Sequence, residues 1–238
     1  MLLERLNSPT VEDFRSMQLD VHSLQADSRG AAVYEVFLNQ FVRALLEDEL
    51  GENRFPYFHI AFKKYLIQNV ILDRPDSTLW DRKNTPQRET PREILELALS
   101  RTYGWLKQEL GANSRRWEWG KLHHYYWKHA GGSRWFTAKL LNVGPIPAPG
   151  DFTTLNSNAY IAARDEYKVT LLPGVRMIVP LNDVNAMKIS MPPGQSGQSG
   201  HRHYDDLAHG WARGEMLDFP VQREVVEAEA VSTLRLSP

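Results

Sequence analysis

The 238-residue sequence contains no cysteine. This absence excludes disulfide bonds, thiolate metal sites and cysteine nucleophiles. An excess of one charge is also missing, because 28 Lys and Arg residues face 29 Asp and Glu residues, for a net charge of −1. Apolar runs of the roughly 18 to 20 residues that a membrane helix needs are absent as well. We therefore expect neither a nucleic-acid partner nor a membrane partner.

What is present favours a packed core, with 42% hydrophobic and 11% aromatic residues. The first half has the apolar spacing of helices. One helix should begin with Thr10 as N-cap, and another should end at Gly51. The best start signal combines Thr90 as N-cap, Pro91 and Glu93. The expected helices cover residues 10–24, 31–50, 55–73 and 90–110.

From about residue 133 the pattern changes to short β-rich runs between Pro and Gly residues. Strands are expected over 152–155, 167–172 and 175–181, and a short helix followed by a terminal strand over 219–236. The fold class is therefore α+β, in a single unit over 1–238. Residues 1–132 should be mainly helical, and 133–238 should supply strands, loops and a wrapping tail.

The stretch RRWEWGKLHHYYWKHAGG, residues 115–132, is the most unusual in the chain. It suggests a metal site, a base-stacking surface or an aromatic core segment. The neutral net charge disfavours stacking on nucleic acid, and a Trp indole buries a large area with one donor to satisfy, so core packing is favoured. A second cluster, HRHYDD at 201–206, offers His201, His203, Asp205 and Asp206 as metal ligands. A His/Asp metal-binding protein therefore stays an open alternative.

No residue is assigned as catalytic, cofactor-binding or metal-ligating. The repeat GQSGQSG, residues 194–200, departs from the G-x-S-x-G nucleophile motif at both Ser196 and Ser199. It also departs from the phosphate-binding P-loop, since no Lys follows. The adjacent carboxylates Asp165 and Glu166, like those at 205 and 206, are expected to be solvated surface groups.

Several segments resemble, in the same order, the C-terminal portion of the β-subunit of the penicillin acylase family. They are TVEDFRSMQLDVHS, TPREILELALSRTYGWLKQELG, WEWGKLHHYYWKHA, GPIPAPGDFTTLNSNAY, VRMIVPLNDVN and GQSGQSGHRHYDDLAHGWARGEM. The resemblance implies an N-terminal-nucleophile hydrolase with an αββα core, which in the complete enzyme hydrolyses acyl amide bonds such as those of β-lactam side chains or acyl-homoserine lactones. It also implies that Trp117, Trp119, Leu122 and Trp127 anchor the core, while His123 and His129 form backbone hydrogen bonds.

In this family an N-terminal Ser, an oxyanion-stabilising Asn and a calcium site all precede the matching segment. No position of this chain matches them, so we expect the chain alone to be inactive and to hold no cofactor. The implied partners are the upstream α-subunit and the N-terminal part of the β-subunit. A family precursor would be periplasmic or extracellular. The alternative is a non-catalytic scaffold or binding module.

Overall fold

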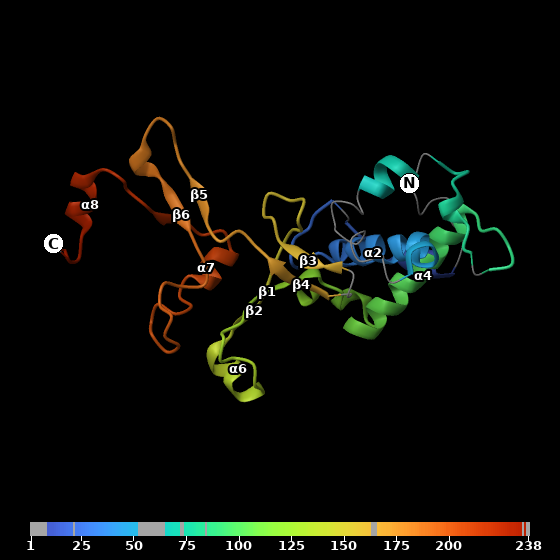
Figure 1. Ribbon diagram of the computed structural model, residues 1–238, viewed down its shortest axis with the longest axis horizontal. Helices are drawn as coiled ribbons and strands as arrows, with labels where there is room; N and C mark the ends of the chain where they lie inside the picture. Colours follow the sequence, from blue (N-terminus) through green and yellow to red (C-terminus); the bar gives the residue numbers. More distant parts are fainter. Residues whose placement is uncertain are drawn as a thin grey trace. The chain divides into compact units, whose positions relative to one another are not determined.

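The computed structural model describes residues 9–20, 22–51, 65–71, 74–83, 85–162, 166–234 and 236. It combines helices with antiparallel strands, as the α+β prediction requires. The chain divides into two compact units (Figure 1). Unit 1 comprises Met1–Tyr126 and Pro145–Leu172, and unit 2 comprises Trp127–Gly144 and Pro173–Pro238. Within the described residues, no helix is long and apolar enough to cross a membrane.

The helical elements of unit 1 are α1 (Pro9–Ser16), α2 (Arg29–Leu50), a π-helical turn η3 (Leu66–Ile71), a 3-10 turn η4 (Thr78–Trp80), α4 (Pro91–Leu110), a 3-10 turn η5 (Ser114–Arg116) and α5 (Trp119–Leu122). Antiparallel strands β3 (Ala159–Ile161) and β4 (Glu166–Leu171) complete it. Helix α4 confirms its prediction fully. Its Thr90 side chain accepts from the Glu93 amide, and the Glu93 carboxylate accepts from the Thr90 amide. Helix α2 also confirms its prediction and ends before Gly51, which has φ of 51°.

The first predicted helix is wrong beyond Ser16, where α1 ends, and Thr10 lies inside α1 rather than at its cap. The chain turns at Gln18, whose φ is 48°. The following loop places the Leu24 and Ala26 carbonyls where the amides of Gly150 and Gly120 donate to them. Tertiary hydrogen bonds therefore override the helical pattern. The predicted helix over 55–73 lies mostly outside the described residues.

One hydrophobic core lies between α2 and α4 and extends to the β3–β4 hairpin. The largest fully buried side chains in it include Phe41 and Trp117. The strand predicted over 167–172 is confirmed as β4, but residues 152–155 form a turn instead of a strand. The reason is local, because the Asp151 carboxylate accepts from both the amide and the hydroxyl of Thr153.

The elements that lie wholly in unit 2 are α6 (Trp135–Leu141), β5 (Arg176–Ile178), the 3-10 turn η7 (Val184–Ala186), β6 (Lys188–Ser190), α7 (Ala208–Ala212), β7 (Leu217–Asp218) and α8 (Arg223–Glu229). Strands β1 (His124–Trp127) and β2 (Val143–Pro147) form a separate two-stranded sheet. A three-stranded sheet has the strand order β5-β6-β7, and both neighbouring pairs are antiparallel. The strand predicted over 175–181 is real but shorter. The C-terminal helix is confirmed, whereas the described residues after it form no strand.

Candidate functional site

Two tryptophans of the 115–132 stretch are core residues. Trp117 is 1% exposed and Trp119 is fully buried. Each indole N–H has a partner, since Trp117 Nε1 donates to the Gly111 carbonyl at 2.8 Å and Trp119 Nε1 to the Gly150 carbonyl at 3.0 Å. Leu122 is partly buried against the same core. The core interpretation is therefore confirmed over the base-stacking one for Trp117, Trp119 and Leu122, whereas Trp127 is not part of this core.

The later part of the stretch, from Trp127 onward, belongs to unit 2. Trp127 is half-buried and meets the Trp211 ring edge-on, with centroids 6.0 Å apart. His129 interacts with backbone, as predicted, because its Nδ1 accepts from the Gly131 amide at 3.0 Å. Its own amide donates to the Asn142 side chain at 2.9 Å. These hydrogen bonds stabilise a turn, so the His129 imidazole has a structural role here.

His123 is the most constrained titratable group of the stretch. It is fully buried and stacks on the Trp119 ring with centroids 4.5 Å apart. Its Nδ1 lies 2.6 Å from the Tyr167 carbonyl oxygen. Because a carbonyl only accepts, Nδ1 carries the proton and Nε2 is the bare nitrogen. Nε2 is buried without a hydrogen-bond partner among the described residues.

Burial determines the charge of this imidazole. Desolvation lowers the pKa of His123 to about 4, against the opposing effect of its hydrogen bond to the Tyr167 carbonyl. His123 is therefore neutral at physiological pH. A general base needs contact with the proton that it removes, and His123 is fully buried. Its role in the described structure is to join α5 to β4.

A buried carboxylate on α2, that of Glu35, contacts strand β3 of the same hairpin. The Tyr160 hydroxyl donates to Glu35 Oε2 at 2.6 Å. Glu35 is fully buried and Tyr160 is 7% exposed. Burial first, and then the charge of Glu35, raise the pKa of Tyr160 well above its usual value. The phenol therefore stays protonated and remains a donor.

Asn39 lies one helical turn after Glu35 and faces the same hairpin. Its Nδ2 donates to the Ala162 carbonyl at 2.9 Å and to the Tyr167 hydroxyl at 3.2 Å. We call Glu35, Asn39, His123, Tyr160 and Tyr167 the polar layer. No member is more than 7% exposed. The polar layer therefore fixes α2 against β3 and β4 and offers substrate no access through the described surface.

The sequence patterns identified His123 but not Glu35 or Asn39. The available signal was a carboxylate and an amide four residues apart inside an otherwise apolar helix. Such residues are seldom fully buried unless they are paired.

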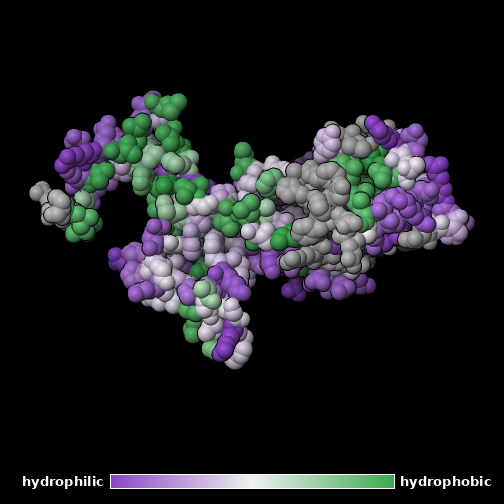
Figure 2. All heavy atoms as spheres, viewed as in Figure 1, coloured by the Kyte–Doolittle hydropathy of each residue, from purple (hydrophilic) through white to green (hydrophobic). Residues whose placement is uncertain are grey.

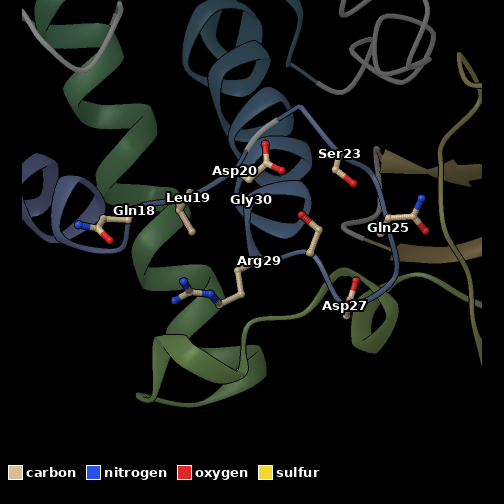
Figure 3. Close-up of a pocket in the computed structure, with 9 residues that line it drawn as sticks. Gln18, Leu19, Asp20, Ser23, Gln25, Asp27, Arg29 and Gly30 are labelled. Carbon is tan, nitrogen blue, oxygen red and sulfur yellow. The ribbon is translucent and has the colours of Figure 1, made fainter.

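A polar pocket of about 320 Å³ lies beside the start of α2. Figure 3 shows Asp20 and Ser23 from the preceding loop and Arg29 from the first turn of the helix. Asp20 and Arg29 form hydrogen bonds with nearby backbone groups. Asp20 accepts from the His22 amide at 2.9 Å, and Arg29 donates to the Met17 carbonyl at 3.1 Å. We find no nucleophile paired with a base in this lining.

The second histidine cluster is a hydrogen-bonded network on the surface of unit 2. His203 Nε2 accepts from Arg202 Nε at 2.7 Å, so its Nδ1 carries the proton and donates to Asp206 Oδ2 at 2.7 Å. The His201 ring lies 5.5 Å from that of His203, and Asp205 is exposed. Across the described part of the chain, no group of three or more His, Asp or Glu side chains is placed to bind a metal ion.

The serines of the GQSG repeat are turn residues. The Ser196 hydroxyl accepts from the Gln198 amide at 3.2 Å, while its own amide donates to the His203 carbonyl at 2.8 Å. Ser199 is exposed. Of the other carboxylate pair, Asp165 lies outside the described residues, and Glu166 pairs with Lys168 at 3.5 Å. The structure thus brings together no nucleophile, base and oxyanion donor among the residues that it describes.

Comparison with known proteins supplies the family. The family model described as penicillin amidase matches residues 20–228. The acyl-homoserine lactone acylase QuiP of Pseudomonas aeruginosa is 34% identical over 216 residues, covering 84% of this chain and 25% of that protein. Its Pseudomonas fluorescens counterpart is 33% identical over 208 residues, covering 84% and 24%.

Among solved structures, a thermostable penicillin G acylase from Alcaligenes faecalis aligns with 100% of this chain and 44% of its own. The TM-score is 0.49 and the sequence identity is 14%. The chain spans about a quarter of the length of the curated relatives that it matches. Because the family model covers most of the sequence, the chain belongs to the penicillin amidase family.

Proposed function

We propose that this chain is the C-terminal β-subunit part of a larger amidohydrolase that cleaves acyl amide bonds, with acyl-homoserine lactones as the favoured substrate class. The family match over residues 20–228 carries the proposal. The Pseudomonas relatives, which are named acyl-homoserine lactone acylases, support the substrate class. The chain's contribution is structural, because its polar layer and aromatic core position helices and strands of the αββα architecture that the family resemblance implies.

The reaction requires groups that we assign to the rest of the enzyme. An N-terminal Ser hydroxyl attacks the amide carbon while its own α-amino group takes the proton. That amine is suited to the task because it titrates near pH 7.7 to 8.0. Backbone donors and an Asn stabilise the oxyanion, the amine product leaves, and water then hydrolyses the acyl-enzyme.

The partners in this proposal are the upstream α-subunit and the N-terminal part of the β-subunit. The calcium ligands of the family would also lie there. If the full precursor follows the family, the enzyme is periplasmic or extracellular.

Activity measurements test the proposal. The purified chain should hydrolyse neither a chromogenic acyl-anilide nor an N-acyl-homoserine lactone, and adding the complementary polypeptide should restore turnover. Turnover by the chain alone, abolished by Ser196→Ala or Ser199→Ala, would contradict the assignment of the nucleophile to another polypeptide. A correctly assembled complex without turnover would favour the non-catalytic scaffold.

A further inference from the structure

The β5-β6-β7 sheet of unit 2 has two chemically different faces. Its register places Met177 opposite Ile189, and Ile189 opposite Leu217. Directly opposed residues of antiparallel strands point to the same face. The Phe219 amide donates to the Met187 carbonyl at 2.8 Å, which continues the same register. We call Met177, Met187, Ile189, Leu217 and Phe219 the apolar face.

The opposite face is polar and partly covered. Arg176 donates to the Trp211 carbonyl at 2.7 Å, and its guanidinium lies 3.7 Å from the Trp211 ring centroid. Lys188 pairs with Asp218 at 2.8 Å. All the charged residues of these three strands thus lie on one face. Desolvating the apolar face therefore removes no charge from water.

The apolar face is exposed in this structure. Met177 is 56% exposed, Leu217 50% and Phe219 44%. Figure 2 shows hydrophobic atoms gathered over the β5–β6 hairpin. A sheet with one apolar face normally buries that face against another element, and unit 2 has little core of its own with which to do so.

We infer that the apolar face docks an apolar element of the polypeptide that supplies the rest of the acylase. The inference rests on the proposed function, because it names the partner as the remainder of that enzyme. The family match runs through the whole face, and the curated relatives carry their matching segment within chains about four times as long as the matched part. In such a chain, the other three quarters are available to cover this face.

Other occupants fit less well. Unit 2 contains nine Lys and Arg against eight Asp and Glu, so its net charge of +1 is too small for a strong electrostatic attraction to an anionic lipid surface. The sheet edges are short, with three residues in β5 and two in β7. Strand addition at an edge therefore has little backbone to pair with, whereas packing on the face uses all three strands.

Co-purification tests the docking. The tagged chain would be co-expressed with the QuiP polypeptide of Pseudomonas aeruginosa lacking the quarter that matches this chain. We expect capture of that polypeptide, and at least a tenfold loss of capture with Met177→Glu combined with Leu217→Glu. Ile178→Glu is the matched control, because Ile178 is also 56% exposed but lies on the opposite face. It should change capture by less than twofold.

Three results would overturn the inference: no capture by the wild-type chain, equal capture by the two-site variant, or equal loss in the control. A dimer of the isolated chain that Met177→Glu dissociates in sedimentation would also overturn it, since the occupant would then be a second copy. Turnover measured on the same samples separates the two proposals. Capture without turnover leaves docking in place and contradicts the catalytic proposal, whereas turnover without face-dependent capture contradicts docking alone.

Discussion

The two units of this chain bury their apolar residues very differently. The hydrophobic core lies entirely in unit 1, where α2, α4 and the β3–β4 hairpin enclose it. Among the described residues of unit 2, the buried hydrophobic side chains are Val143, Ala208 and Trp211. Each fully buried large apolar side chain contributes about 1.5 to 3 kcal/mol. Unit 1 therefore has the means to fold by itself, whereas unit 2 depends on further contacts.

Three pairs of substitutions test this comparison. In each pair, the same residue type is replaced by the same new residue once in unit 1 and once in unit 2. Stability would be measured by urea unfolding of the isolated chain, followed by circular dichroism.

The largest effect on stability should come from the tryptophan pair. Trp119→Ala removes a fully buried indole and its bond to the Gly150 carbonyl, so we expect a loss of about 3 to 5 kcal/mol. Trp135→Ala, at a residue that is 77% exposed, should change stability by about 0.5 kcal/mol or less. Equal losses would contradict the comparison.

The second pair concerns pH. Because the pKa of His123 is about 4 in the folded chain and 6.5 when unperturbed, the unfolded chain binds the proton first as pH falls. This contribution to stability is complete above pH 6.5, decreases between pH 6.5 and 4, and levels off below 4. It amounts to about 3 kcal/mol.

His123→Gln should flatten this part of the profile of unfolding free energy against pH. The exposed His209 of unit 2 provides the control, since His209→Gln should leave the slope intact. An unchanged slope in His123→Gln would show that the buried imidazole is not the titrating group.

The smallest effect should come from asparagine. Asn39→Ala removes the donors to the Ala162 carbonyl and the Tyr167 hydroxyl, which should cost about 1 to 3 kcal/mol. Asn182→Ala, at an exposed loop position in unit 2, should cost about 0.5 kcal/mol or less. If both variants unfold at the same urea concentration, the polar layer adds nothing to the stability of unit 1.

Local signals predicted those elements whose ends are determined locally. The capping box at Thr90 and the glycine at 51 set the ends of α4 and α2 correctly, because caps act within one turn. The same reasoning extended α1 too far, since the loop that follows Gln18 is held by the amides of Gly120 and Gly150, about a hundred residues away. It also placed a strand where Asp151 instead organises a turn.

The candidate site also separates features that the sequence predicted from features that depend on tertiary contacts. The burial of Trp117 and Trp119 followed from residue type, and the backbone bond of His123 was expected from the family resemblance. The partners of Glu35 and Asn39 did not, because their pairing depends on the tertiary position of a distant hairpin. The apolar face likewise became visible only when the register aligned Met177, Ile189 and Leu217.

The long sequence separations within the polar layer have a consequence for synthesis. Glu35 is bonded to a residue 125 positions later, and Asn39 to residues 123 and 128 positions later. At about 5 to 20 residues per second, a ribosome needs roughly 6 to 25 s to cover that distance. During this interval α2 exposes a carboxylate and an amide on the face that later becomes buried. Helix α2 therefore cannot complete its packing until the hairpin has left the ribosome, so the order of translation delays the closing of the core.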